Sequence, residues 1–208
     1  NWGAVACRGF MRICGDGGRR DLPLPNLRGH HQCWNAALAV VALQNQKLFT
    51  ISDEAIEKGV QSAEWPGRLE RVTQGRVAGT LPRGWELWYD GGHNDSGGEA
   101  LGRFLVNWAS EGPVHLVVGM LQSKDPVACL SPLLPFAETV STFSFALDPF
   151  NQTGPSYEAA VLAQKLSGIG KDVRAYPSLK DAVVGVSHTG ARGRILVTGT
   201  LYAYKDLF

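Results

Sequence analysis

The sequence shows no bias of charge and no long apolar run, and each absence excludes a class of protein. It has 20 lysines and arginines against 19 acidic residues, for a formal net charge of +1. This balance gives no basic surface for nucleic acid or for an anionic membrane. Apolar stretches such as residues 36–43 fall well short of the roughly 18 residues of a membrane span. Charged residues at Arg8, Arg12 and Asp16 also interrupt any early signal peptide. We therefore expect no nucleic-acid partner and no membrane association.

Cysteine is scarce, and its spacing does not suit metal binding. The four cysteines form no CxxC pair, and no histidine accompanies them at zinc-finger spacing. They are Cys7, Cys14, Cys33 and Cys129. We expect free thiols in a reducing cytoplasm, and no metal site in this chain.

The sequence does contain enough apolar residues, 44% of the total, to build a sizeable core. The chain begins with asparagine, and its first 21 residues read as strands from the middle of a domain, so we expect a fragment or a processed product. A proline-rich extended stretch, 21–29, leads into a helix at 31–46. Ser52 is expected to cap a second helix, which ends before the breaker at 65–67. We place a boundary there, with the end of one domain at 1–62 and a complete domain at 63–208.

Strand and helix patterns alternate through the second domain. The expected strands are 86–89, 114–120, 139–147, 173–176 and 194–200. The expected helices are 98–111, 127–134, 156–166 and 179–188. This alternation predicts right-handed βαβ crossovers and an α/β fold. The sheet should be Rossmann-like and mainly parallel, with helices on both faces.

A glycine-containing turn, Asp90-Gly91-Gly92-His93, follows the apolar strand WELWY and precedes a helix. Ligands bind beyond the carboxyl ends of parallel strands, and glycines let the backbone approach them closely. Asp90 can accept two hydroxyl hydrogen bonds, as a ribose requires, and His93 can donate to a phosphate. A plain strand-to-helix turn with capping Asp and Asn side chains explains the same residues equally well.

Three other segments carry weaker signals. Arg68, on the turn WPGR, is suited to clamp a phosphate, but pairing with a neighbouring glutamate is the simpler interpretation. Asn35 could meet an adenine edge or merely face solvent on its helix; the adjacent histidines before it point about 100° apart and cannot easily share a metal ion. Lys124 and Asp125 follow the strand VVGM, where a solvated ion pair is the simpler interpretation.

The order of these motifs carries more information than any one of them. The series LPLPNLRGHHQCWNAALAV, WPGRLE, DGGHND, VVGMLQSKD and VTGTLY resembles the folylpolyglutamate synthase / dihydrofolate synthase family, a branch of the Mur ligase group. The resemblance extends from Leu22 to Tyr202. The combination of WPGR with DGGHN is fairly specific to the folate branch.

The resemblance implies an ATP- and Mg²⁺-dependent amide ligase, acting as a monomer. ATP would phosphorylate the carboxylate of dihydropteroate or a folyl-glutamate, and the amine of L-glutamate would then displace phosphate. By position in the motifs, Asn35 would lie near the adenine, Arg68 would reach the ATP phosphates and Asp90 would hold the ribose. His93 matches the histidine of the same motif.

Other positions are assigned less firmly or depart from the family pattern. Lys124 and Asp125 fall in its KD segment, and we place them on the glutamate side of the site without a firm role. Gly92 replaces the usual alanine, and Asp95 replaces the usual proline. The Asp95 carboxylate adds negative charge beside the phosphate site, which disfavours ATP.

No GxxxxGK[ST] loop occurs in the sequence, so the phosphate-cradling part of such an enzyme is absent. We assign no catalytic residue within the chain, and expect the magnesium ligands and most of the folate site upstream of it. The 208 residues alone should therefore lack ligase activity. Two alternatives remain open: a fragment of a Mur-type ligase acting on a cell-wall precursor, and a non-catalytic nucleotide-binding module.

Overall fold

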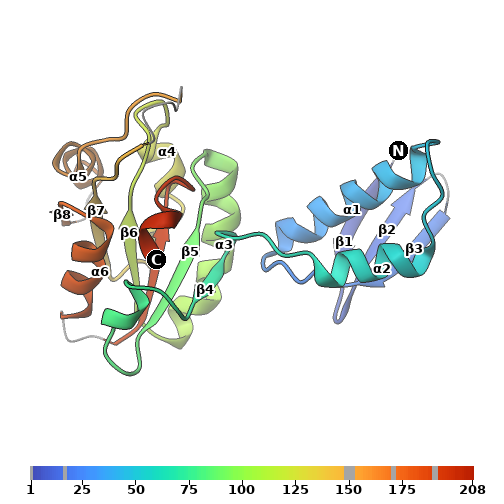
Figure 1. The fold of residues 1–208 in the computed structure, drawn as a ribbon, viewed down its shortest axis with the longest axis horizontal. Coiled ribbons are helices and arrows are strands. Elements are labelled where there is room, and N and C mark those ends of the chain that lie inside the picture. Colours follow the sequence, from blue (N-terminus) through green and yellow to red (C-terminus); the bar gives the residue numbers. More distant parts are fainter. Residues whose placement is uncertain (1, 16–17, 148–152, 170–171, 189–191) are drawn as a thin grey trace. The chain divides into compact units, whose positions relative to one another are not determined.

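The computed structural model describes residues 2–15, 18–147, 153–169, 172–188 and 192–208. The chain divides into two compact units, Asn1–Pro66 and Gly67–Phe208 (Figure 1). This division falls a few residues beyond the boundary expected from the sequence. Each unit has its own core and is described separately.

The first unit is a three-stranded antiparallel sheet with two helices. Its elements are β1 (Trp2–Ala6), β2 (Phe10–Gly15), β3 (Gly18–Pro23), α1 (His30–Asn45) and α2 (Asp53–Ser62). The strands pair in chain order, β1 with β2 and β2 with β3. Alternation along β2 buries Met11 and Ile13 against apolar residues of both helices. The Ser52 hydroxyl accepts from the Ala55 amide at 3.2 Å, which confirms the expected cap of α2.

Helix α1 is apolar on more than the face that it buries. Ala37 and Val40 pack into the core, whereas Trp34 and Leu38 are 51% and 56% exposed. The ring of Trp34 lies 5.9 Å from that of the partly exposed Trp2, centroid to centroid. Large exposed apolar groups this close together are typical of a surface that another segment covers.

The second unit is built on a six-stranded sheet in the order β4-β5-β9-β6-β7-β8. The strands are β4 (Glu70–Val72), β5 (Glu86–Asp90), β6 (Val114–Val118), β7 (Thr139–Phe143), β8 (Val173–Tyr176) and β9 (Arg194–Thr198). Only β4 runs antiparallel to its neighbour, and the other pairs are parallel. The mainly parallel sheet expected from the sequence is confirmed.

Helices flank both faces of this sheet (Figure 1). Helices α3 (Asp95–Glu111), α4 (Pro126–Leu130) and α5 (Ala159–Ser167) pack on one face. Helix α6 (Leu179–Ser187) packs on the other, together with the 3-10 helices η1 (Ala78–Thr80) and η3 (Tyr204–Leu207). A third 3-10 helix, η2 (Leu134–Phe136), joins α4 to β7. The central strands β9 and β6 are buried on both sides, which explains their continuous apolar runs.

Three expected helices have bounds in the structure that differ by three residues or more, and the one expected at 156–166 begins later, as α5 at Ala159. The single helix expected at 127–134 is wrong: α4 ends at Leu130 and η2 follows, because prolines at 132 and 135 remove backbone donors. The helix expected from residue 98 begins earlier, at Asp95, because Asn94 caps it.

No helix in the described part of the chain is long and apolar enough to cross a membrane. All four cysteines are free thiols.

The end of the sheet opposite the motif turns is held by an ionic cluster around Glu86. Its carboxylate lies 2.9 Å from the guanidinium of Arg71 and 3.3 Å from that of Arg194, and it accepts from Trp88 Nε1 at 3.0 Å. Burial would raise the pKa of Glu86, but the Trp88 hydrogen bond and the two arginine charges outweigh it and lower the pKa. Glu86 therefore stabilises the folded unit above its unfolded pKa and loses that contribution as the pH falls.

We expect the thermal midpoints of wild type and Glu86→Gln to differ most near pH 7 and to converge as the pH falls through the lowered pKa of Glu86, where its carboxylate becomes protonated. Protonated glutamate and glutamine present similar neutral groups to the arginines. Unfolding midpoints of both proteins measured between pH 7 and pH 3 test this. A gap that stays constant over that range would contradict the assigned role.

Candidate functional site

Three turns meet at the carboxyl edge of the second unit's sheet. We call residues 67–70 the Arg68 turn, residues 90–94 the Asp90 turn, and residues 199–202 the Gly199 turn. The Asp90 turn follows β5 and the Gly199 turn follows β9, its parallel neighbour. The Arg68 turn leads into β4, which pairs with β5. The motifs WPGR, DGGHND and VTGTLY are thus neighbours in space.

Backbone hydrogen bonds fasten these turns together. The Gly91 amide donates to the Gly67 carbonyl at 2.8 Å, which joins the Asp90 turn to the Arg68 turn. The Gly199 amide donates to the Gly92 carbonyl at 3.0 Å, which joins the Gly199 turn to the Asp90 turn. Both bonds use only main-chain atoms.

The glycines of the motifs are required by close packing. A Cβ atom on Gly91 would lie 2.2 Å from the Leu201 side chain, and one on Gly67 would lie 2.8 Å from it. Leu201 therefore fills the space between two turns that only glycine leaves open. Gly199 has a φ of 98°, and a Cβ there would approach the Gly119 carbonyl oxygen to 2.5 Å.

Asp90 is almost fully buried, with 7% of its surface exposed. Its Oδ2 accepts from the Leu69 amide at 2.9 Å, and its Oδ1 accepts from the Gly92 amide at 2.8 Å. One carboxylate therefore links the Arg68 turn to its own turn. Each oxygen keeps a second lone pair for a further donor.

Arg68 lies on a backbone with left-handed residues on both sides. Gly67 has a φ of 73° and Leu69 a φ of 44°. A non-glycine residue in this region costs on the order of 1 kcal/mol or more. The burial of Leu69, at 2% exposed, and its amide bond to Asp90 hold it there.

Arg68 is half-buried, and its guanidinium makes no ion pair with any residue that the structure describes. The nearest candidate along the chain, Glu70, is bound elsewhere: its Oε2 accepts from the Gly67 amide at 2.8 Å. The Tyr204 hydroxyl donates to Oε1 at 2.9 Å and to Oε2 at 2.8 Å. The simpler interpretation of Arg68, an arginine paired with this glutamate, is wrong.

His93 and Asn94 share the start of α3. The Nδ1 of His93 lies 3.0 Å from the Gly91 carbonyl oxygen, and a carbonyl only accepts, so Nδ1 carries a hydrogen. Nε2 then accepts when the ring is neutral and donates when it is protonated. The Asn94 side chain accepts from the Gly97 amide at 2.9 Å. The capping interpretation of this turn is therefore correct for Asn94.

Lys124 and Asp125 follow β6, on the other side of β9. The Asp125 carboxylate caps α4, with Oδ1 accepting from the amides of Val127 at 2.9 Å and Ala128 at 3.1 Å. Lys124 is half-buried, and within the described residues the two side chains form no ion pair with each other. Asp125 thus has a structural role that the sequence did not indicate.

Asn35 belongs to the first unit, whereas the other five candidate residues belong to the second. It is exposed on α1 and donates to the Gln32 side-chain oxygen at 3.0 Å. The described residues contain no group of three side chains able to hold a metal ion.

Sequence reasoning missed Tyr89 and Tyr204, and it considered Glu70 only as an ion-pair partner for Arg68. The fully buried Tyr89 hydroxyl donates to the Thr200 carbonyl at 2.8 Å, and burial raises the pKa of Tyr89. The Tyr204 ring meets Tyr89 edge-on at 5.2 Å. No spacing rule could have paired Glu70 with Tyr204, because they are 134 positions apart.

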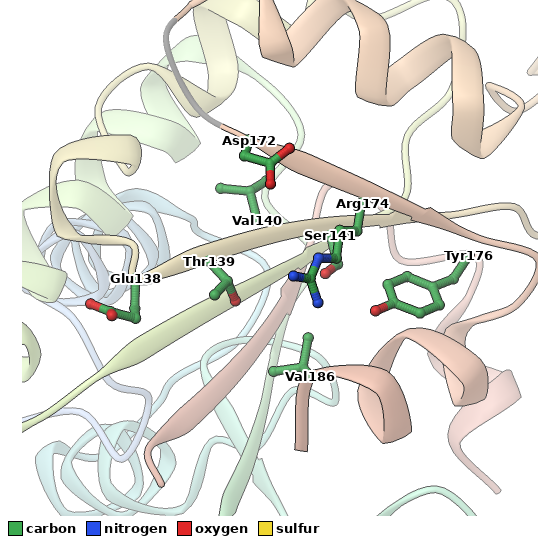
Figure 2. A pocket seen from close by; sticks show the side chains of 8 residues that line it. All are labelled: Glu138, Thr139, Val140, Ser141, Asp172, Arg174, Tyr176 and Val186. Carbon is green, nitrogen blue, oxygen red and sulfur yellow. The ribbon is translucent and has the colours of Figure 1, made fainter. Parts of the chain in front are cut away.

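A hollow of about 160 Å³ lies elsewhere, between β7, β8 and the end of α6 (Figure 2). It is lined by Glu138, Thr139, Val140, Ser141, Asp172, Arg174, Tyr176 and Val186. None of the residues predicted from the sequence lines it.

The chain is similar to known folate ligases along nearly all of its length. It is 27% identical over 186 residues to the dihydrofolate synthase/folylpolyglutamate synthase of Bacillus subtilis, an alignment that covers 88% of this chain and 39% of that protein. The chain thus spans less than half of this relative.

Solved structures share the fold. The Escherichia coli FolC structure in complex with ADP superposes with a TM-score of 0.73 at 22% identity, over 99% of this chain and 44% of that one. A bifunctional folylpolyglutamate synthase/dihydrofolate synthase with Mn, AMPPNP and L-glutamate bound gives 0.72 at 24% identity, with the same shares covered.

A family model described as the C-terminal domain of dihydrofolate synthetase matches residues 78–208, well over half of the chain and nearly all of its second unit. This match agrees with the resemblance drawn from the motifs. The chain belongs to the dihydrofolate synthetase C-terminal domain family.

Proposed function

We propose that this chain forms the C-terminal part of an ATP-dependent ligase that adds L-glutamate to dihydropteroate, to folyl-glutamates or to both. The observation that carries the proposal is Arg68, an arginine without an acidic partner in the described structure, on a turn fixed beside the start of α3. A guanidinium so placed and the unpaired amides of a helix start suit a phosphate group.

The nucleotide would lie over the carboxyl edge of the second unit. Arg68 would bind its phosphates, and His93 Nε2, the ring nitrogen left over by the Gly91 contact, would donate to a phosphate or to the sugar when the ring is protonated. Asp90 would meet the ribose through the remaining lone pairs of its carboxylate oxygens. The Asp90 bonds to two backbone amides would hold that carboxylate still.

The first unit would be the end of a central ATP-binding domain, with residues 1–62 assigned to it and residues 63–208 to the C-terminal domain. The exposed apolar face of α1 supports this, since it is suited to packing against more of the same domain. Asn35, also exposed on α1, would approach the adenine edge. Lys124 and Asp125 would lie on the glutamate side, and Asp125 would act there mainly by starting α4.

In such a ligase ATP supplies the phosphoryl group that activates the carboxylate as an acyl phosphate, and Mg²⁺ neutralises phosphate charge. The described residues hold no carboxylate cluster for Mg²⁺, so its ligands would come from other parts of the polypeptide. This chain would contribute positive charge and fixed geometry at the phosphates. The protein would act as a monomer in the cytoplasm.

The test uses the complete product of the gene. Phosphate release is followed with ATP and L-glutamate, with dihydropteroate and tetrahydrofolate offered as separate acceptors. Turnover with dihydropteroate establishes dihydrofolate synthase activity, and turnover with tetrahydrofolate establishes the polyglutamylating one. Turnover with neither, but with a cell-wall precursor, would mean a Mur-type ligase. No turnover with any acceptor would favour a non-catalytic nucleotide-binding module.

A further inference from the structure

We propose that Tyr204 and Glu70 are positioning residues that keep the Arg68 guanidinium available to the nucleotide. The inference rests on the proposed role of Arg68 and adds two residues to it. Neither would touch the nucleotide: their effect would pass through the Arg68 turn.

Glu70 is the natural competitor for Arg68. It lies two positions along the chain, at the start of β4, and an arginine and a glutamate this close commonly form an ion pair. In the structure both Glu70 oxygens are instead directed to neutral donors, the Gly67 amide and the Tyr204 hydroxyl. The carboxylate therefore fixes the backbone on one side of Arg68 without using the guanidinium.

Tyr204 is held firmly enough to keep Glu70 in this arrangement. Its ring packs edge-on against Tyr89, with centroids 5.2 Å apart and planes at 87°, and against Phe208 at 5.6 Å. Burial and the hydrogen bond to Glu70 raise the pKa of Tyr204 to about 12, so its hydroxyl stays a donor at neutral pH. The ring contacts thus limit rotation of the Tyr204 side chain, and the raised pKa keeps its hydroxyl protonated.

Loss of the Tyr204 hydroxyl would remove two contacts from Glu70. The charged carboxylate would then find its best remaining partner in Arg68, and that ion pair would compete with the phosphates. The backbone bonds of the Arg68 turn to Asp90 and Gly91 would remain, so the fold should change little.

The decisive variant is Tyr204→Phe in the complete gene product, with the dissociation constant of a non-hydrolysable ATP analogue measured by calorimetry. We expect binding to weaken about three- to fivefold, the competition of one exposed ion pair. Adding Glu70→Gln should restore it, because glutamine still accepts from the Gly67 amide but does not pair with Arg68. Tyr176→Phe, at the far edge of the sheet, is the matched control and should bind as wild type does.

An Arg68→Ala background tests whether Tyr204 affects nucleotide binding by acting on Arg68. There Tyr204→Phe should have no further effect on nucleotide binding. An equal loss in both backgrounds, or no rescue by Glu70→Gln, would overturn the positioning role while leaving the proposed function intact. A wild-type protein that binds no nucleotide, or an Arg68→Ala variant that binds as well as wild type, would instead overturn the proposed role of Arg68 and this inference with it.

Discussion

Replacing Arg68 with alanine in the complete gene product is expected to weaken ATP binding by about 10- to 100-fold, the range for losing a charge-assisted hydrogen bond or two. The guanidinium has no acidic partner within the described structure, so its removal leaves no buried carboxylate behind. The effect should therefore appear in nucleotide affinity and not in stability. Calorimetric titration with an ATP analogue, with thermal unfolding in parallel, measures both quantities.

Two further variants sharpen this test. Arg68→Lys keeps the charge but loses the planar fork, and should fall between wild type and the alanine variant. Arg103→Ala removes an exposed arginine of α3 that pairs only loosely with Glu99, at 3.5 Å, and should leave binding unchanged. Equal affinity of wild type and Arg68→Ala would contradict the assignment of the phosphate site.

Gly98→Ala should destabilise the second unit by about 3 kcal/mol, at the upper end of the range for overpacking. An added Cβ would lie 1.9 Å from the Cys129 carbonyl oxygen and 2.9 Å from its carbon, both backbone atoms of α4. Backbone cannot rotate away as a side chain can, so α3 and α4 would have to separate. The Gly98 amide also bonds to the Asn94 carbonyl, so the shift would reach the Asp90 turn.

Gly59→Ala is the matched control for this prediction. It also places an alanine within a helix, α2, but no heavy atom lies within 4 Å of the added Cβ. Alanine should stabilise that helix by about 1 kcal/mol. Urea unfolding curves of the two variants and wild type should thus show shifts of opposite sign. Destabilisation of similar size in both would mean that close packing of α3 on α4 is not the cause.

The sheet of the second unit was predictable because its central strands are short, apolar and bounded by turn residues. The expected strand 173–176 matches β8, and the motif turns fall at the strand ends where they were expected. The strand β4 was missed, because three residues after a turn give no alternation to read. Prolines 132 and 135 mark the break between α4 and η2, so the sequence does contain the signal against a single helix at 127–134.

The candidate site was predictable at the level of motifs but not of contacts. Gly91 and Asp90 were placed correctly at the end of a strand. The sequence could not reveal that the two carboxylate oxygens of Asp90 accept hydrogen bonds from the amides of Leu69 and Gly92. Nor could it pair Glu70 with Tyr204, since that contact exists only once β9 and η3 fold back beside β5.

The most direct test of the account follows one oxygen atom. The complete gene product is given ATP, L-glutamate and dihydropteroate whose carboxylate is labelled with ¹⁸O, and the released phosphate is analysed by mass spectrometry. If the carboxylate is phosphorylated and the amine of glutamate then expels phosphate, that phosphate carries one labelled oxygen and the new amide keeps the other. We expect this result. Turnover that yields unlabelled phosphate and no amide would contradict the proposed ligase chemistry.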